Sequence, residues 1–248
     1  MDVFQSILNS ILFCDKFGDY RDRPATTSGA AGTIHEAFWA DAFNRNLRLD
    51  QVEIEVRLGK LPASKRGPFD TNIPRALFQQ IVQSLQDYHG WDDRSHTRDM
   101  VGYFPEKDES LRLIVSEDGR CTAHSKQKLT QADFAGNSLP FDFRLAVNLE
   151  LDLPTSNLNI EHATRVINRE RNSFTLKNTR YDLTRITHLD GREEHQVELE
   201  LLNLTETQLT HTNAQELTME VQQRLIDILN ACEPIRNFDI SLIRKRHF

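Results

Sequence analysis

The stretch Gln51-Val-Glu-Ile-Glu-Val-Arg-Leu-Gly59 alternates between polar or charged residues and apolar ones. Because residues two apart in a β-strand lie on the same face, this stretch predicts a strand with two chemically separate faces. One face carries Glu53, Glu55 and Arg57, and the other carries four aliphatic side chains. The fold then depends on whether other strands of the chain repeat this separation.

The same separation recurs at residues 141–150 and 194–201. The charged faces of these two segments hold Asp142, Arg144, Asn148 and Glu150, and Glu194, Gln196, Glu198 and Glu200. Other segments place basic residues together on one face: Arg112; His124, Lys126 and Lys128; Arg165, Arg169 and Arg171; and Arg180, which is followed on that face by Asp182.

A charged face on one strand is typical of a sheet with one face in solvent. For any single strand, a solvent-exposed charged face therefore stays a possible interpretation. The whole set favours a closed eight-stranded antiparallel β-barrel, with the apolar faces packed under helices and the charged faces pointing inward. Charges inside a barrel are costly unless they are paired or hold a ligand. We therefore expect a tunnel for a metal ion and a polyanion, with acids on one wall and bases on the other.

The remaining elements complete a β-rich α+β domain that we expect to span residues 1–248. Period-2 alternation runs from about residue 95 to 204, with hairpin turns at Asp118-Gly119 and Asp190-Gly191. Residues 1–46 are expected to form an N-terminal helical segment, and residues 47–248 the barrel with its flanking helices.

Two flanking helices are predicted from apolar residues at helical spacing. The first begins after Asn72, has Pro74 in its first turn and ends at Gly90. The second spans about residues 213–231. Their expected buried stripes are Leu77, Ile81, Leu85 and Tyr88 in the first helix, and Leu217, Val221, Leu225 and Ile228 in the second.

Composition narrows the function. The net charge of −7 over 248 residues argues against a protein that grips a long stretch of nucleic acid, because such binding neutralises many phosphates. Three widely spaced cysteines exclude a disulfide framework and a zinc-finger spacing, and they suggest a reducing compartment. No apolar run approaches the roughly 20 residues of a membrane-spanning helix, so no membrane partner is expected.

The inward residues suit the hydrolysis of a triphosphate. Two Glu-x-Glu pairs, Glu53/Glu55 and Glu198/Glu200, supply the oxygen ligands that Mg²⁺ or Mn²⁺ prefers. Arginine and lysine neutralise phosphate oxygens, and a carboxylate such as Glu150 is suited to orient the attacking water. The sequence contains neither a P-loop nor a Cys-phosphatase motif.

Four stretches resemble the fungal and protozoan RNA 5′-triphosphatases of the triphosphate tunnel metalloenzyme superfamily, and they occur in the family's order. The stretches are Val52-Glu-Ile-Glu-Val-Arg-Leu-Gly59, Asp142-Phe-Arg-Leu-Ala-Val-Asn-Leu-Glu150, Arg169-Glu-Arg-Asn-Ser-Phe174 with Arg180-Tyr-Asp-Leu-Thr184, and His195-Gln-Val-Glu-Leu-Glu200. The resemblance implies a metal-dependent enzyme that removes the γ-phosphate of 5′-triphosphate RNA, the first step of mRNA cap formation.

The resemblance also assigns roles to residues. Glu53, Glu55 and Glu200 match the metal ligands, with Glu198 in the same acidic cluster; Glu150 matches the residue that positions water, and Asp182 a supporting acid. Phosphate-binding positions are matched by Arg112, Lys126, Arg169 and Arg171, and Arg57, Lys128 and Arg144 add further basic positions on the substrate's path.

This chain departs from the family pattern at specific positions. Gln196 stands where many relatives have glutamate, and Ile167 where some have arginine. His124 is more readily explained as a structural histidine than as a phosphate ligand, and Asp99 as a turn residue. Trp91 is most simply an anchor that packs against a helix.

Two other functions stay open at this point. One is a tunnel enzyme that acts on inorganic triphosphate or on nucleoside triphosphates. The other is a non-catalytic barrel that binds a polyanion. For the RNA enzyme we expect nucleoside triphosphates as side substrates, an RNA guanylyltransferase as partner and a nuclear location.

Overall fold

The computed structural model describes residues 51–62, 68–105, 110–136, 140–203, 221, 223–225, 227–228 and 243–245. The predicted helical segment 1–46 lies outside the described residues, and so does most of the predicted helix 213–231. Within that helix, Val221, Leu225 and Ile228 are described as helical and buried, in agreement with the expected stripe. Among the residues described, no helix is long and apolar enough to cross a membrane.

Eight antiparallel strands close into a barrel, as predicted. The strand order is β3-β2-β6-β7-β8-β1-β5-β4, and β3 pairs with β4 to close the ring. A short ninth strand pairs antiparallel with the C-terminal end of β4, at residues 134–136. The strands are β1 (Val52–Gly59), β2 (Asp93–Tyr103), β3 (Leu111–Ser116), β4 (Cys121–Gly136), β5 (Asp142–Leu153), β6 (Arg165–Leu176), β7 (Thr179–His188), β8 (Glu193–Leu201) and β9 (Ile243–Lys245).

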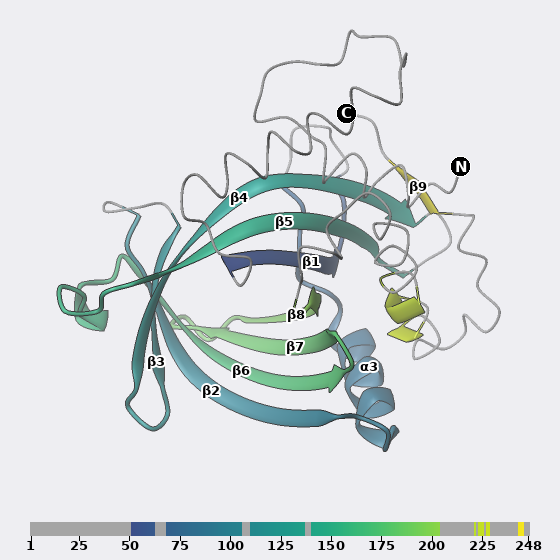
Figure 1. Cartoon of the computed structure of the whole chain (residues 1–248), viewed down its shortest axis with the longest axis horizontal. Coiled ribbons are helices and arrows are strands. Elements are labelled where there is room, and N and C mark those ends of the chain that lie inside the picture. Colours follow the sequence, from purple (N-terminus) through teal and green to yellow (C-terminus); the bar gives the residue numbers. More distant parts are fainter. Residues whose placement is uncertain are drawn as a thin grey trace, which may run out of the picture.

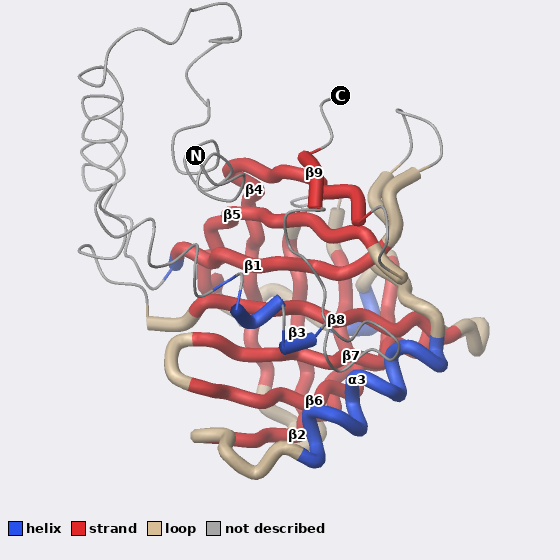
Figure 2. The backbone as a smooth tube through the Cα atoms, turned by 90° about the vertical axis from the view of Figure 1, so that its right-hand side faces the viewer, coloured by secondary structure: helices blue, strands red, loops and turns tan. Residues whose placement is uncertain are grey.

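The eight paired strands form a closed ring. In Figure 1, β4 and β5 lie along one side of the barrel, and β2, β6 and β7 lie along the opposite side. The helix α3 (Arg75–Asp87) runs along the outside of the barrel near β6, β7 and β8 (Figure 2). The two predicted hairpin turns are confirmed, since Gly119 and Gly191 adopt φ values of +82° and +84°, which glycine accommodates without strain.

The apolar faces form the core under α3. On β1, Ile54, Val56 and Leu58 are at most 2% exposed and belong to the same buried cluster as the apolar face of α3. That cluster also takes in Tyr181, Leu199 and other outward residues of β7 and β8. The charged face of each of these strands must therefore point into the barrel.

Three expectations about single residues can be compared with the structure. Trp91 is a packing anchor as expected, because its Nε1 donates to the backbone oxygen of Leu85 at 2.7 Å and its ring packs against Tyr181. The prediction for Tyr88 was wrong: α3 ends at Asp87, and Tyr88 is 48% exposed, while Phe78 takes a place in the buried stripe.

The prediction that Asp99 lies in a turn was also wrong. Asp99 lies within β2, opposite Ser116 of β3 and Arg169 of β6. The strand continues through this polar segment because pairing with β6 along its whole length satisfies its backbone groups. The side chain of Asp99 is only 8% exposed.

Candidate active site

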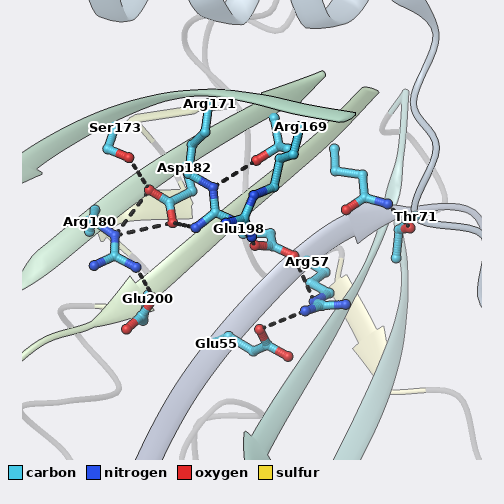
Figure 3. Close-up of polar contacts among 12 residues, drawn as sticks. Glu55, Arg57, Thr71, Arg169, Arg171, Ser173, Arg180, Asp182, Glu198 and Glu200 are labelled. Atoms are coloured by element: carbon cyan, nitrogen blue, oxygen red, sulfur yellow. Dashed lines mark hydrogen bonds and ion pairs between the residues drawn. The ribbon is translucent and has the colours of Figure 1, made fainter. Parts of the chain in front are cut away.

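The two Glu-x-Glu strands are direct neighbours, and their register brings their charged residues together. β1 pairs with β8 so that Glu55 faces Glu200 and Arg57 faces Glu198. Directly opposed residues on one face of a sheet have their Cβ atoms roughly 5 Å apart. Figure 3 shows Glu55, Arg57, Glu198 and Glu200 on the interior side of these strands.

Lys126 of β4 holds the two carboxylates of β1. Its Nζ contacts Glu53 and lies 2.9 Å from Oε2 of Glu55. From β5, Asn148 Nδ2 donates to Glu53 Oε2 at 3.3 Å and to Glu55 Oε1 at 3.0 Å. A lysine and an amide from neighbouring strands thus converge on the first Glu-x-Glu pair.

Glu198 lies among arginines. Its carboxylate is 3.0 Å from Nε of Arg57 and 3.6 Å from Nη2 of Arg171. Burial disfavours the ionised form, but the charges of Arg57 and then Arg171 outweigh it and lower the pKa of Glu198 to about 2. Glu198 therefore stays ionised and neutralises the basic side of the interior.

Asp182 organises the arginines of β6 and β7, and its side chain is only 2% exposed. It accepts hydrogen bonds from Ser173 Oγ at 2.6 Å, from Arg171 Nη1 at 2.8 Å and from Arg180 Nε at 3.0 Å. Arg171 Nε also donates to Thr184 Oγ1 at 3.0 Å. These contacts fix the plane of the Arg171 guanidinium (Figure 3).

Two more arginines face the interior, each held by one carboxylate. Arg169 donates from Nε and Nη2 to Oδ2 of Asp99 at 3.1 and 2.7 Å. Burial, followed by the charge of Arg171, lowers the pKa of the Arg169 guanidinium. Arg112 donates to Oε1 of Glu150 at 3.0 Å. Each of these two guanidiniums thus faces the interior with one carboxylate partner.

Glu53 and Glu200 carry unfavourable negative charge. Burial and the neighbouring carboxylate of Glu55 raise the pKa of Glu53. Burial raises the pKa of Glu200 to about 7 in spite of Arg180, and Glu53 contributes to the rise. Such crowding of carboxylates is what a bound cation relieves.

These carboxylates have the right chemistry for a hard divalent ion, because Glu53, Glu55 and Glu200 lie on two adjacent strands of one buried face. As the side chains stand, no three acidic or other ligating groups in the described part of the chain converge closely enough to hold a metal. Lys126 holds Glu53 and Glu55, while Arg180 pairs with Glu200. An ion bound by all three glutamates would have to compete with these two cations.

The interior charges are interleaved, which corrects the expectation of an acidic wall facing a basic one. Lys126 lies between acids, and Glu198 lies between bases. The reason is the cost of burying like charges together, which falls when side chains of opposite charge lie next to one another in the interior.

Most residues predicted for the site do lie together, but Arg144, one of the predicted substrate-binding residues, has its partners elsewhere. Arg144 is held by Asp133, with Nε 2.7 Å from Oδ1, and its guanidinium lies 4.8 Å from the centre of the Phe69 ring. Lys128 is exposed. His124 Nδ1 is 2.9 Å from Oδ1 of Asp152, and its structural role stays a prediction.

Three residues that the sequence analysis did not assign to the site contact it. Alternation already places Asn148 on the inward face of its strand, and alternation together with the strand order could have placed Asp99 there. Thr71 precedes α3 and carries no such signal. Its Oγ1 accepts from Nε2 of Gln196 at 3.0 Å, so the segment before α3 reaches the barrel interior (Figure 3).

The fold has known counterparts among solved structures. The S. pombe Pct1 RNA triphosphatase has a TM-score of 0.61 and 15% identity, over 88% of this chain and 97% of that chain. The same enzyme in complex with the Spt5 CTD gives a TM-score of 0.60 and 16% identity over 88% and 97%. The mimivirus RNA triphosphatase domain is 17% identical over 83% of this chain and 99% of that one, with a TM-score of 0.48. At these identities the likeness to Pct1 supports the fold alone.

A comparison with curated protein sequences found no match. The model of a protein family described as mRNA capping enzyme, beta chain, matches residues 69–238. The matched range begins after β1, so the grouping of Glu53 and Glu55 with Glu200 rests on the barrel geometry. Since the match covers more than half of the chain, this protein belongs to the mRNA capping enzyme beta-chain family, the family of the capping RNA triphosphatases.

Proposed function

We propose that this RNA triphosphatase uses a divalent ion to remove the γ-phosphate from the 5′-triphosphate end of RNA and leave a 5′-diphosphate end. The observation that carries the proposal is the crowding of Glu53, Glu55 and Glu200 in the same closed interior as Arg169 and Arg171. Carboxylates and guanidinium groups in one interior suit a cation together with a chain of phosphates.

The arginines and Lys126 bind the substrate. Arg169 and Arg171 lie two residues apart on one face of β6, a spacing that suits neighbouring phosphate groups. Asp99 and Asp182 orient these two guanidiniums, so they are positioning residues rather than catalytic ones. Preformed orientation lowers the cost of ordering the side chains around the triphosphate.

The reaction is the attack of a water oxygen on the γ-phosphorus. The bond from the γ-phosphorus to the bridging oxygen breaks, and that oxygen leaves with its electron pair on the RNA diphosphate. One proton of the attacking water stays on the released phosphate, and the other passes to solvent. Glu150 orients the water; its side chain is 36% exposed and is held by Arg112 at 3.0 Å. When bound, a divalent ion supplies Lewis-acid stabilisation of the phosphoryl oxygens. Arg169 and Arg171 neutralise the charge that remains.

The decisive experiment is phosphate release from γ-labelled 5′-triphosphate RNA, with Mg²⁺ or Mn²⁺ and with excess EDTA. We expect release with either metal and none with the chelator. Full activity in EDTA would overturn the metal mechanism. Faster turnover of inorganic triphosphate than of RNA would favour the alternative tunnel enzyme, and binding without release in any metal would favour the non-catalytic barrel.

The remaining proposals concern the setting of the reaction. Nucleoside triphosphates should serve as side substrates, because they carry the same three phosphates. A diphosphate RNA end is the acceptor that an RNA guanylyltransferase needs, so we propose such an enzyme as a partner and the nucleus as the location. Co-purification with a guanylyltransferase and imaging of the tagged chain would test these two points.

A further inference from the structure

One inward arginine of β6 differs from the others in what holds it. Arg165 lies on the same face of β6 as Arg169 and Arg171, and its side chain is exposed. Its guanidinium carbon lies 5.1 Å from the centre of the Tyr103 ring, the geometry of a cation–π contact. An aromatic ring thus supports this guanidinium.

Arg165 also differs from the other inward arginines in its partners. In the described part of the chain no carboxylate forms an ion pair with Arg165, whereas an acidic side chain holds each of the others. The pairs are Arg57 with Glu198, Arg112 with Glu150, Arg144 with Asp133, Arg169 with Asp99, Arg171 with Asp182 and Arg180 with Glu200. Arg165 therefore presents a charged, planar group that the barrel does not neutralise.

The pair also lies beside the phosphate-binding part of the interior. In the register of β2, Tyr103 faces Arg165 on one side and Arg112 on the other. Arg112 holds Glu150, whose 36% exposure contrasts with 6% for Glu55 and marks where the site is open to solvent. Arg165 and Tyr103 are thus within one strand spacing of an arginine at this opening.

Apolar neighbours fix the position of the ring. Tyr103 packs against a buried cluster that includes Val101 and Ile167, inward residues of β2 and β6. Ile167 is a position where the family resemblance leads one to expect arginine in some members. Here the apolar Ile167 packs against Tyr103 and adds no further charge. The position of the Tyr103 ring under Arg165 therefore depends on a residue in which this chain differs from some relatives.

We infer that Arg165, supported by the Tyr103 ring, stacks against the nucleobase of the 5′-terminal nucleotide while the triphosphate lies in the basic interior. Bases stack on aromatic rings and on guanidinium planes, and such stacking tolerates all four bases because each has a π face. The contact would distinguish nucleoside-linked triphosphates from inorganic triphosphate without reading sequence. The inference rests on the proposed function, because it assigns a further contact to the same substrate.

The test compares substrates that share the phosphates and differ in the nucleoside. Arg165→Ala and Tyr103→Leu should raise KM roughly tenfold for triphosphate RNA and for the four nucleoside triphosphates alike. Turnover of inorganic triphosphate should stay within about twofold of the parent, since no base is present to stack. Tyr103→Phe keeps the ring and should retain the parent values. Arg98→Ala is the matched control, because Arg98 is an exposed arginine on the opposite face of β2.

Equal losses on all substrates would show that Arg165 contacts phosphate or only stabilises the barrel, and would overturn the inference. Unchanged KM values in Arg165→Ala would also overturn it. Equilibrium binding of a non-hydrolysable nucleoside triphosphate and of inorganic imidotriphosphate makes the same comparison without catalysis. If the parent binds both but releases phosphate from no substrate, the proposed function fails, while the binding difference still decides the role of Arg165.

Discussion

Replacing Lys126 by methionine removes the ammonium group that contacts the carboxylates of Glu53 and Glu55. Methionine keeps most of the length and the apolar stem of lysine, so the barrel should still form. A divalent ion needs the same carboxylate oxygens, so lysine and ion compete for them. We therefore expect Lys126→Met to bind Mn²⁺ more tightly than the parent when no triphosphate is present.

The size of the effect follows from the contacts that the ion must break. Hydrogen bonds between charged groups contribute roughly 1.5–3 kcal/mol each. The side chains of Lys126, Glu53 and Glu55 are only 16%, 13% and 6% exposed, so solvent screening removes little of this. Taking one such contact as the net difference, Mn²⁺ affinity should rise roughly ten- to a hundredfold, since about 1.4 kcal/mol corresponds to a factor of ten.

Calorimetric titration with Mn²⁺ measures this directly, and circular dichroism checks the fold. Lys60→Met is the control. It removes the same charge from the chain, but at an exposed position. Turnover of triphosphate RNA by Lys126→Met should fall, because the lysine is also expected to bind phosphate. Mn²⁺ affinity equal to or weaker than that of the parent, in a folded variant, would refute the competition.

Three further outcomes are expected. Glu198→Ala should lower the free energy of unfolding by roughly 1.5–3 kcal/mol, because Arg57 and Arg171 lose the carboxylate that they share. The loss is no larger because Glu55 still pairs with Arg57 and Asp182 still pairs with Arg171. Glu53→Ala should cost less, because burial and Glu55 already disfavour the ionised carboxylate of Glu53, and urea denaturation separates the two variants. Gln196→Glu should be tolerated in turnover assays, since glutamate can accept from the Thr71 hydroxyl, and a hundredfold loss, about 2.7 kcal/mol of barrier, would contradict this. Finally, short and long triphosphate RNAs should give similar kcat/KM at moderate salt, because an acidic protein makes few contacts with the phosphates of the RNA backbone. A steep rise of kcat/KM with RNA length would point to a separate RNA-binding surface.

Much of the fold follows from alternation in the sequence. The outward residues Ile54, Val56 and Leu58 predict the buried face of β1, and their period fixes the inward direction of Glu53 and Glu55 without any knowledge of neighbours. Which strands are neighbours does not follow from alternation. The pairing of β1 with β8, which brings Glu55 opposite Glu200, depends on how the whole sheet closes.

The ion pairs of the interior could not be predicted from the sequence either, because alternation does not show which strands lie near one another. Lys126 reaches Glu55 from a strand that is not its hydrogen-bonded neighbour, across β5 and past Asn148. Such contacts are set by the curvature of the barrel, which brings side chains of non-adjacent strands together in the interior. Thr71 is a further case, because a residue outside any strand reaches Gln196.

The interleaved charges connect the stability of the barrel with its chemistry. Arg171 is held by Asp182 and lies near Glu198, and Lys126 is held by Glu55, so each cation already has the partner that a buried charge requires. A substrate and an ion of opposite charge can enter such an interior by exchange of partners: phosphates replace carboxylates on the arginines, and the ion replaces lysine on the glutamates. Phosphate and ion should therefore assist each other's binding, because each frees groups that the other needs, and neither the acids nor the bases of this interior can be understood as a wall on its own.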